Sequence, residues 1–361
     1  MNIVFLTYQN IDTDGRTKEL LRALTKLANV TVISKKWNNK EENVKTYFVE
    51  KGGYFNFIKE AVKLSSRINE KMDYIFIDNR RATIPGLKIQ KKLGCRMIYD
   101  ARELYLRREV DSLSGIIGCY FEKKVIENSE LVIATNEFRR NIMEKEFSIK
   151  NKIIVFDNFR KLEYSNDADI EVLQQKYGDI FSSEDKYVIS TAGCDINRDT
   201  DKLVRAMKKL EGKARLLLVG CKEDSQKEEI EHIIEEEAIT NVEMIGRVQH
   251  DDLKYLISKS NIGVAMYHKK NQNNLYCSSG KIYEFLFEGI PIATSDNPSL
   301  KSVIDKYNVG SCNEDIYIAI NDVCCNYELY RKNVQAFMGT DIIEKEQNSF
   351  HELLANILTS M

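Results

Sequence analysis

Residues 271–293 read NQNNLYCSSGKIYEFLFEGIPIA. A polar, turn-rich run ends at Gly280, and an amphipathic segment from Lys281 to Phe287 follows before a glycine and a second apolar run. We therefore predict a loop, a helix, a glycine stop and a strand. The N–H groups and dipole at the start of that helix, with the charge of Lys281, suit an anion, and Glu284 can face the same place. The plain alternative is a surface helix that begins with Ser-Ser-Gly-Lys.

Length and composition favour a soluble protein of two domains. The chain has 361 residues, of which 43% are hydrophobic and 30% charged, and a single core rarely grows to that size. No apolar run approaches the roughly 20 residues of a membrane span, and the start MNIVFLTYQN lacks the features of a signal peptide. Eight cysteines without a CxxC pair and four histidines without an HExxH pattern favour free thiols in a reducing cytosol and no structural metal.

Charge is divided unevenly along the chain. Residues 1–165 carry 31 Lys and Arg against 22 Asp and Glu, whereas residues 166–361 carry 22 against 33. A basic half suits anionic acceptors or anionic lipid surfaces. The alternative is that it only balances the acidic half, and the sequence leaves both interpretations open.

Strands and helices alternate from the N-terminus, which is typical of a doubly wound parallel sheet. Apolar runs at residues 3–6 and 30–33 flank a helix predicted from Arg16 to Leu27. The first loop has no GxGxxG, which argues against a nicotinamide or flavin dinucleotide site. Further strands are predicted at 74–77, 97–99, 131–135 and 153–156, with helices at 85–93 and at 115–128, the latter with Ile116, Ile117, Tyr120, Phe121 and Val125 inward.

Polar side chains follow these strands. Because ligands sit at the carboxyl ends of parallel strands, that shared edge is a candidate site, although each residue alone is better explained as a cap or a salt-bridge partner. The residues there are Asp78, Arg80, Arg81, Asp100, Arg102, Glu103 and Asn158.

A second cycle of strands and helices follows a polar stretch between Tyr164 and Lys186. Two such sheets would face a cleft, which is a common place for ligands. The predicted divisions are a first domain at residues 1–165, a linker at 166–185, a second domain at 186–340, and a C-terminal helix at 341–361.

In this order of elements the chain resembles, over nearly its whole length, the GT-B-fold glycosyltransferases, in particular the retaining, group-1-like glycosyltransferase family 4. Residues 279–292, SGKIYEFLFEGIPI, are similar to that family's Pro-small-Lys…Glu…Gly-x-Pro pattern. The resemblance implies that Glu284 contacts the donor ribose and that Lys281 and the Ser279-Gly280 turn lie by the diphosphate. Two positions depart from the pattern: an earlier glutamate of many members is Tyr276 here, and the usual proline is Ser279.

Two other stretches of the second domain are similar to the family. The loop Ala192–Asp199 has the glycine and basic residue of the family's first loop, which implies roles in donor binding for Gly193 and for Arg198, on the distal phosphate. A guanidinium suits a phosphate because it can donate two parallel hydrogen bonds. Gly246-Arg247-Val248 resembles the family's turn whose backbone meets the base.

The first domain carries weaker similarities. Asp14-Gly15-Arg16 resembles a D-x-R loop, and Asp100-Ala101-Arg102-Glu103 resembles a D-x-H-E motif in which arginine replaces histidine. The resemblance implies Asp14 and Arg16 on the acceptor side and Asp100, Arg102 and Glu103 as candidate catalytic residues. Arg80, at the same carboxyl edge of the sheet, is a further acceptor-side candidate. Arginine is no base at neutral pH, but it could stabilise charge on the leaving group or the acceptor. Ser349–Glu352 resembles a terminal S-W-E in a helix that crosses back to the first domain.

The resemblance implies an α/β, GT-B glycosyltransferase of the hexosyltransferase type, retaining and independent of metal, with no cofactor besides its UDP- or GDP-sugar donor. The acceptor would be a saccharide or a lipid-linked sugar in the synthesis of cell-surface polysaccharide or glycoconjugate. We expect no nucleic acid partner and a cytoplasmic location. A further hypothesis is that residues 53–58 contact the inner face of the cell membrane, and the alternative is that they belong to a core helix. A catalytically weak binding subunit of this fold and a nucleotide-sugar epimerase are the alternatives.

Overall fold

The computed structural model describes residues 1–35, 37, 44–149 and 152–360. The chain forms two compact units, and the first consists of Met1–Asp157 together with Ile343–Met361. The second unit is Asn158–Ile342. Among the described residues, no helix combines the length and the apolar character needed to cross a bilayer.

A seven-stranded sheet forms the centre of the first unit. Its strands run in the order β3-β2-β1-β4-β5-β6-β7, and every pair is parallel. The strands are β1 Asn2–Thr7, β2 Asn29–Ser34, β3 Lys45–Phe48, β4 Tyr74–Asp78, β5 Arg96–Ala101, β6 Leu131–Ala134 and β7 Lys152–Val155. The helices are α1 Gly15–Thr25, α2 Tyr54–Leu64, α3 Thr83–Leu93, α4 Leu113–Asn128, α5 Glu137–Glu146 and the C-terminal α15 Ile342–Ser360.

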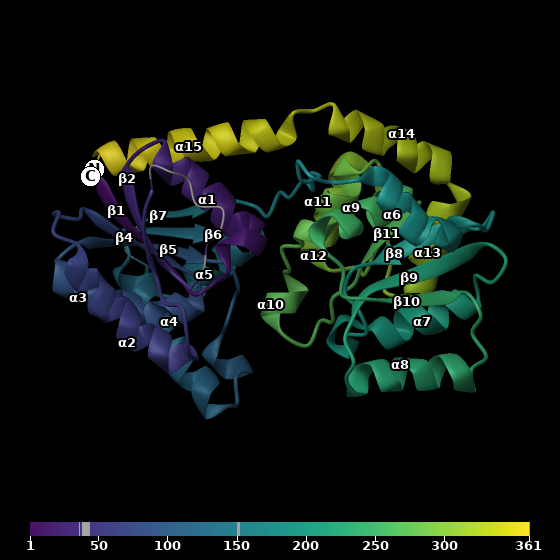
Figure 1. Cartoon of the computed structure of the whole chain (residues 1–361), viewed down its shortest axis with the longest axis horizontal. Coiled ribbons are helices and arrows are strands. Elements are labelled where there is room, and N and C mark those ends of the chain that lie inside the picture. Colours follow the sequence, from purple (N-terminus) through teal and green to yellow (C-terminus); the bar gives the residue numbers. More distant parts are fainter. Residues whose placement is uncertain (36, 38–43, 150–151, 361) are drawn as a thin grey trace. The chain divides into compact units, whose positions relative to one another are not determined.

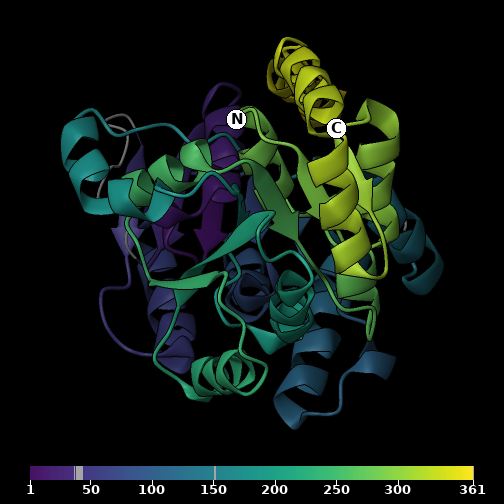
Figure 2. The same ribbon diagram turned by 90° about the vertical axis from the view of Figure 1, so that its right-hand side faces the viewer.

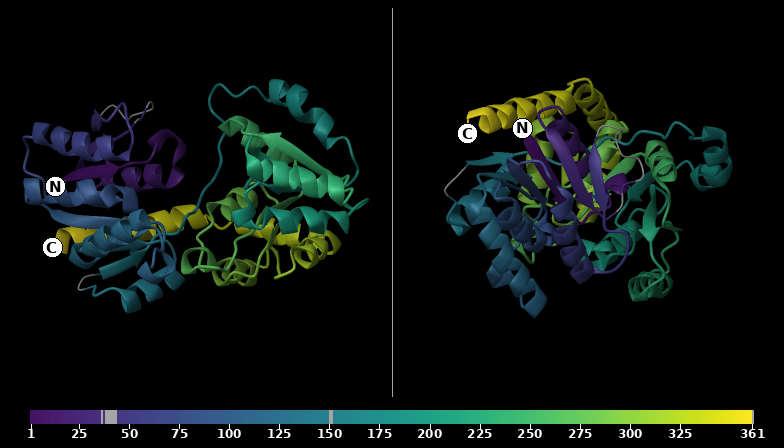
Figure 3. Two further views of the ribbon diagram at one scale, coloured as in Figure 1. Left: turned by 90° about the horizontal axis from the view of Figure 1, so that it is seen from below. Right: turned by 60° about the vertical axis from the view of Figure 1, so that its left-hand side comes forward.

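Both faces of this sheet are covered. Helices α2 to α5 pack on one face, and α1 and α15 pack on the other (Figures 1 and 3). Strand β4 is therefore buried at every residue, which is why it reads as a continuous apolar run rather than an alternating one. The ring of Phe350 on α15 stacks on Phe156 at 4.2 Å between centroids. This contact confirms that the C-terminal helix returns to the first unit.

The second unit is built on a six-stranded parallel sheet in the order β10-β9-β8-β11-β12-β13 (Figure 2). The strands are β8 Lys186–Ser190, β9 Ala214–Cys221, β10 Val242–Gly246, β11 Ile262–Ala265, β12 Ile292–Thr294 and β13 Gly310–Cys312. One face is covered by α6 Ile170–Tyr177, α9 His250–Lys259, α11 Gly280–Phe287, α12 Pro298–Tyr307 and α14 Tyr327–Met338. The other face carries α7 Thr200–Lys208, α8 Ser225–Glu236 and α13 Ile316–Cys325, and the short α10 Gln272–Leu275 lies in a loop.

The structure differs from the sequence prediction in several elements. The segment predicted as a linker contains α6, whose Leu173 and Tyr177 are buried in the core of the second unit, and the division between units falls at Asp157. Strand β3 and helices α5, α12 and α13 were not predicted. The prediction that Ile117 and Tyr120 point inward was wrong, because both are exposed on α4. This helix is apolar on several sides, so its period does not identify the buried face.

Candidate functional site

The stretch quoted at the outset forms the predicted loop, helix and strand in the second unit. Helix α11 begins at Gly280 and buries Ile282, Phe285 and Leu286 against the sheet. Its N-cap Ser279 makes no capping hydrogen bond with its side chain. The Ser279 hydroxyl instead accepts a hydrogen bond from Tyr267 Oη at 3.0 Å. The first N–H groups of α11 are therefore not capped by the residue that usually does so, which suits an anion at this end.

Lys281 is directed toward the loop that follows β8. Its Nζ donates to the carbonyl of Thr191 at 2.8 Å. Burial, and then the nearby charge of Arg198, lower the pKa of Lys281 to about 8, against the opposing effect of Glu284. An ammonium so placed gains from a phosphate, because a phosphate would replace the water that burial removes.

Arg198 lies beside the same helix start. Its guanidinium stacks over the ring of Tyr267 at 4.1 Å, and its Nε lies 4.0 Å from the Asp195 carboxylate. Among the described residues its buried Nη1 atom has no hydrogen-bond partner. Buried donors in folded proteins are almost always satisfied, so this orphaned donor indicates a missing acceptor. A phosphate oxygen is the acceptor that a guanidinium binds best.

The loop that follows β8 contacts Lys281 and carries Arg198, and it requires a glycine at position 193. Gly193 has a φ of +63°, and a Cβ atom there would come 2.6 Å from the carbonyl oxygen of Gly220. The Gly193 N–H donates to the carbonyl of Val219 at 3.0 Å, which holds the loop against the end of β9. The next residue, Cys194, is a buried free thiol with its Sγ 2.8 Å from that of Cys221.

Glu284 lies one turn into α11 and is almost fully buried, at 4% exposure. Its Oε1 forms an ion pair with Arg160 Nε at 3.2 Å. Burial raises the pKa of Glu284, while Arg160 and Lys281 oppose that rise. Arg160 was not predicted, because it precedes Glu284 by more than a hundred residues and belongs to no motif. The structure therefore brings Arg198, Lys281, Glu284 and Arg160 to one end of α11.

Gly246 is the last residue of the edge strand β10, and Arg247 and Val248 follow it. The β10–β9 ladder shifts register between Ile245 and Gly246, and Gly246 and Arg247 are exposed. Strand β9 lies between β10 and β8 in the sheet. The three residues share the carboxyl edge of the sheet with the Gly193 loop and are separated from it by one strand.

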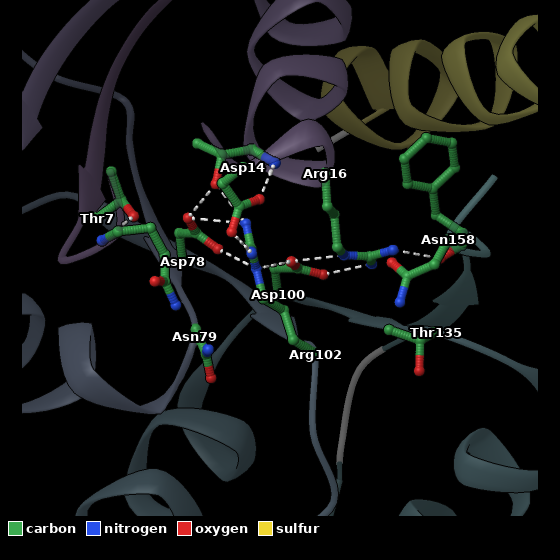
Figure 4. A network of polar contacts seen from close by, with 12 residues as sticks. Thr7, Asp14, Arg16, Asp78, Asn79, Asp100, Arg102, Thr135 and Asn158 are labelled. Carbon is green, nitrogen blue, oxygen red and sulfur yellow. Dashed lines mark hydrogen bonds and ion pairs between the residues drawn. The ribbon is translucent and has the colours of Figure 1, made fainter. Parts of the chain in front are cut away.

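The candidate residues of the first unit form a buried ionic network (Figure 4). Arg102 donates from Nε to Asp78 Oδ1 at 2.7 Å and from Nη1 to Asp14 Oδ2 at 2.6 Å. Arg16 forms a two-point pair with Asp100, at 2.9 and 2.6 Å, and donates to the Phe156 carbonyl at 2.7 Å. The carboxyl ends of β4 and β5 and the start of α1 thus bring together a connected set of two arginines and three carboxylates.

This network engages Arg102 through its whole guanidinium. Its Nη2 also contacts Asp78 and the hydroxyl of Thr17, and its Nε lies 3.3 Å from Asp100. Burial alone would lower the pKa of Arg102, but the three carboxylates outweigh that effect and raise it. Burial raises the pKa of Asp78 to about 6, since Arg102 offsets it only in part and the other two carboxylates repel it. A structural role accounts for each of these contacts of Arg102.

Within the described part of the chain, Arg80 and Glu103 make their contacts around Tyr105 rather than in this network. The Arg80 guanidinium lies over the ring of Tyr105 at 4.1 Å, and Tyr105 donates to Glu103. Arg80 Nε is also 3.6 Å from Glu122, a buried carboxylate on α4 that accepts from Tyr99 at 2.6 Å. Burial raises the pKa of Glu122 to about 7. Glu122 and Tyr99 were not predicted, because each stands within an apolar element. The acceptor-side and catalytic candidates thus fall into two separate clusters.

The match to a known protein family lies within the second unit. Residues 178–315, less than half of the chain, match the family model described as glycosyl transferases group 1. No curated protein matches the sequence. Among solved structures, sucrose-phosphate synthase from Thermosynechococcus elongatus is 14% identical with a TM-score of 0.74, and HepE of Anabaena in complex with UDP-glucose is 12% identical with a TM-score of 0.75, each over 100% of both chains.

An E. coli structure described as trehalose-6-phosphate bound with UDP-2-fluoro glucose is 10% identical, with a TM-score of 0.69 over 98% of this chain and 99% of the other. Likeness at such low identity establishes architecture. The chain has the GT-B fold, with two Rossmann-like units that are each built on a parallel sheet.

Proposed function

We propose that the protein is a glycosyltransferase that binds a nucleotide-diphosphate sugar on its second unit. The observation that carries this proposal is the orphaned Nη1 of Arg198 beside Lys281 and the uncapped start of α11. Two cations and a helix N-terminus match the charge of a diphosphate. The match of residues 178–315 to group 1 glycosyl transferases supports the same reading.

We propose that different residues of the site bind different parts of the donor. Arg198 and Lys281 bind the diphosphate, with the backbone of Ser279 and Gly280, and Gly193 lets the backbone of its loop approach closely. Glu284 accepts hydrogen bonds from the ribose hydroxyls, as a carboxylate can. Backbone groups of the turn at Gly246 meet the base. UDP is the first nucleotide to test, since HepE and the E. coli structure are described with UDP-sugars, and GDP is the second.

The chemistry we propose is transfer of a hexosyl group with stabilisation of the leaving group. Negative charge develops on the departing diphosphate, and the cations at the start of α11 are already in place to stabilise it without reorganisation. Retention of anomeric configuration and independence of a metal ion belong to this proposal through the family resemblance. We assign no catalytic base, because Arg102 is held by three carboxylates.

We propose a saccharide or lipid-linked acceptor on the first unit, in the synthesis of polysaccharide or glycoconjugate, with the protein in the cytoplasm and in peripheral contact with the membrane. Phe55 on α2 is 86% exposed, and Lys51 and Lys59 nearby are exposed as well. An apolar ring beside cations suits an anionic bilayer surface. Phe55→Ser should reduce binding to phosphatidylglycerol vesicles at low salt without changing stability. Equal binding by the variant would remove membrane contact at this helix from the proposal.

Release of free nucleotide from the sugar donor tests the proposal directly. The protein is incubated with UDP-glucose or GDP-mannose, with and without a mixture of saccharide acceptors. Arg198→Ala, Lys281→Ala and Glu284→Ala should each lower the rate at least tenfold while remaining folded. Full activity in all three would contradict the site assignment. Donor binding without turnover would favour a binding subunit, a reading that the engagement of Arg102 supports, and isomerised sugar without acceptor would indicate an epimerase.

A further inference from the structure

Arg160 makes two close contacts with helix α11. Its Nε forms the ion pair with Glu284 at 3.2 Å. Its aliphatic stem crosses the first residue of the helix, because a Cβ atom on Gly280 would come 2.4 Å from Arg160 Cδ. Glycine at position 280 thus leaves room for the Arg160 side chain to cross the start of the helix. The charged end of Arg160 then reaches the carboxylate one turn further on.

The two residues before Arg160 hold the same segment against α11. Asn158 donates from Nδ2 to the carbonyl of Ser278 at 3.0 Å. The ring of Phe159 packs on that of Tyr283, with centroids 4.4 Å apart. Three consecutive residues therefore contact the turn and helix that carry the proposed donor site. The contacts of Asn158 and Phe159 hold the segment that carries Arg160 beside the helix, and the Arg160 side chain itself is 39% exposed.

We propose that Arg160 is a positioning residue of the donor site, which keeps the Glu284 carboxylate ionised and oriented to accept the donor hydroxyls. This inference rests on the proposed function. A carboxylate as buried as Glu284 takes up a proton unless a cation balances it. The pair with Arg160 is made through Oε1, and a carboxylate has further acceptor positions for hydroxyl groups.

The charged and titratable groups around Glu284 come from three elements. Arg160 approaches from the segment after β7, Lys281 lies on α11, and His250 lies on α9. Burial has the largest effect on the pKa of Glu284 and raises it, and Arg160 has the strongest opposing effect. Lys281 is directed to Thr191 and is proposed to hold the phosphate. Removing Arg160 should therefore leave Glu284 protonated over a wider range of pH.

The test is the pH profile of UDP-glucose binding. The affinity is measured by calorimetry from pH 5 to 8, and GDP-mannose is the second probe. Arg160→Gln should shift the acid limb of the affinity to higher pH. A shift of one pKa unit corresponds to a roughly tenfold weaker affinity on that limb. Arg160→Lys should restore part of the profile. Glu284→Gln should bind weakly without an acid limb, and adding Arg160→Gln to it should cause little further loss.

Arg205→Gln is the matched control. Arg205 lies on α7 of the same unit, its exposure is comparable to that of Arg160, and its Nε pairs with Glu237 at 2.7 Å. It should leave the profile unchanged. An unchanged profile in Arg160→Gln, with weakened binding in Glu284→Gln, would overturn the positioning role and leave the proposed function intact. Unweakened binding in both variants would overturn the donor role of Glu284 itself, and absence of nucleotide-sugar binding by the wild-type protein would overturn the proposed function.

Discussion

Arg102 Nε lies 2.7 Å from Asp78 Oδ1 in the first unit. Asp78 is fully buried, and Arg102 also reaches Asp14 and Asp100 (Figure 4). The position that would hold a histidine in the motif it resembles is thus occupied by a cation that neutralises buried carboxylates. Arg102 joins the loop before α1 to the ends of β4 and β5. We therefore expect these contacts of Arg102 to stabilise the first unit.

Arg102→Met should destabilise the protein strongly, since it leaves three carboxylates with one fewer partner. Removing one member of a buried ion pair costs about 3–5 kcal/mol. The measurement is the free energy of unfolding of the first unit, from urea denaturation. Arg108→Ala is the control, because its pair with Glu146 is largely exposed and should contribute about 1 kcal/mol or less. Equal free energies of unfolding for the two variants would show that the network does not stabilise the first unit to this extent.

The pKa of Lys281 predicts how donor affinity depends on pH. Burial first, and then Arg198, lower that pKa to about 8, so the ammonium is present below pH 8 and is lost as the pH rises through it. UDP-glucose affinity should fall roughly tenfold from pH 7 to pH 9. Lys281→Arg keeps its charge throughout this range and reports any titration of the nucleotide itself. The same fall in both proteins would assign the dependence to another group.

Gly193→Ala should damage the loop that carries Arg198. The new Cβ atom would meet the Gly220 carbonyl at 2.6 Å, at a φ of +63° that disfavours side chains. Backbone atoms cannot move aside as a flexible side chain can, so we expect a loss of about 1–3 kcal/mol and weaker donor binding. Gly178→Ala is the control, because its Cβ atom would meet open space at an ordinary φ. Its free energy of unfolding should change by about 0.5 kcal/mol or less.

The sequence predicts those parts of the fold in which a local pattern and the tertiary structure agree. Strand β4 and helix α11 follow their apolar patterns, and the glycine stop at Gly289 has a φ of +79°. Strand β3, at the edge of the sheet, is only half-buried, so its residues carry no clear signal. Helix α4 is apolar on more than one side, which hides the fact that Tyr120 faces solvent.

The candidate site shows the same limit in its side chains. The residue types at the start of α11 indicate an anion, but nothing local reveals that Arg160 pairs with Glu284 or that Tyr267 stacks on Arg198. In the first unit, the shared edge of the sheet is predictable from strand order. The mutual neutralisation of Arg102 and the carboxylates depends on distances that only the folded chain fixes.

The central claim is that the start of α11 binds the diphosphate of a nucleotide sugar. Calorimetric titration of UDP-glucose and GDP-mannose into the wild-type protein and into Lys281→Met tests it most directly. The account predicts that at least one donor binds the wild-type protein at micromolar concentration and binds Lys281→Met at least tenfold more weakly, with unfolding unchanged. Binding of equal strength to both proteins, or no binding of either donor to the wild type, would contradict it.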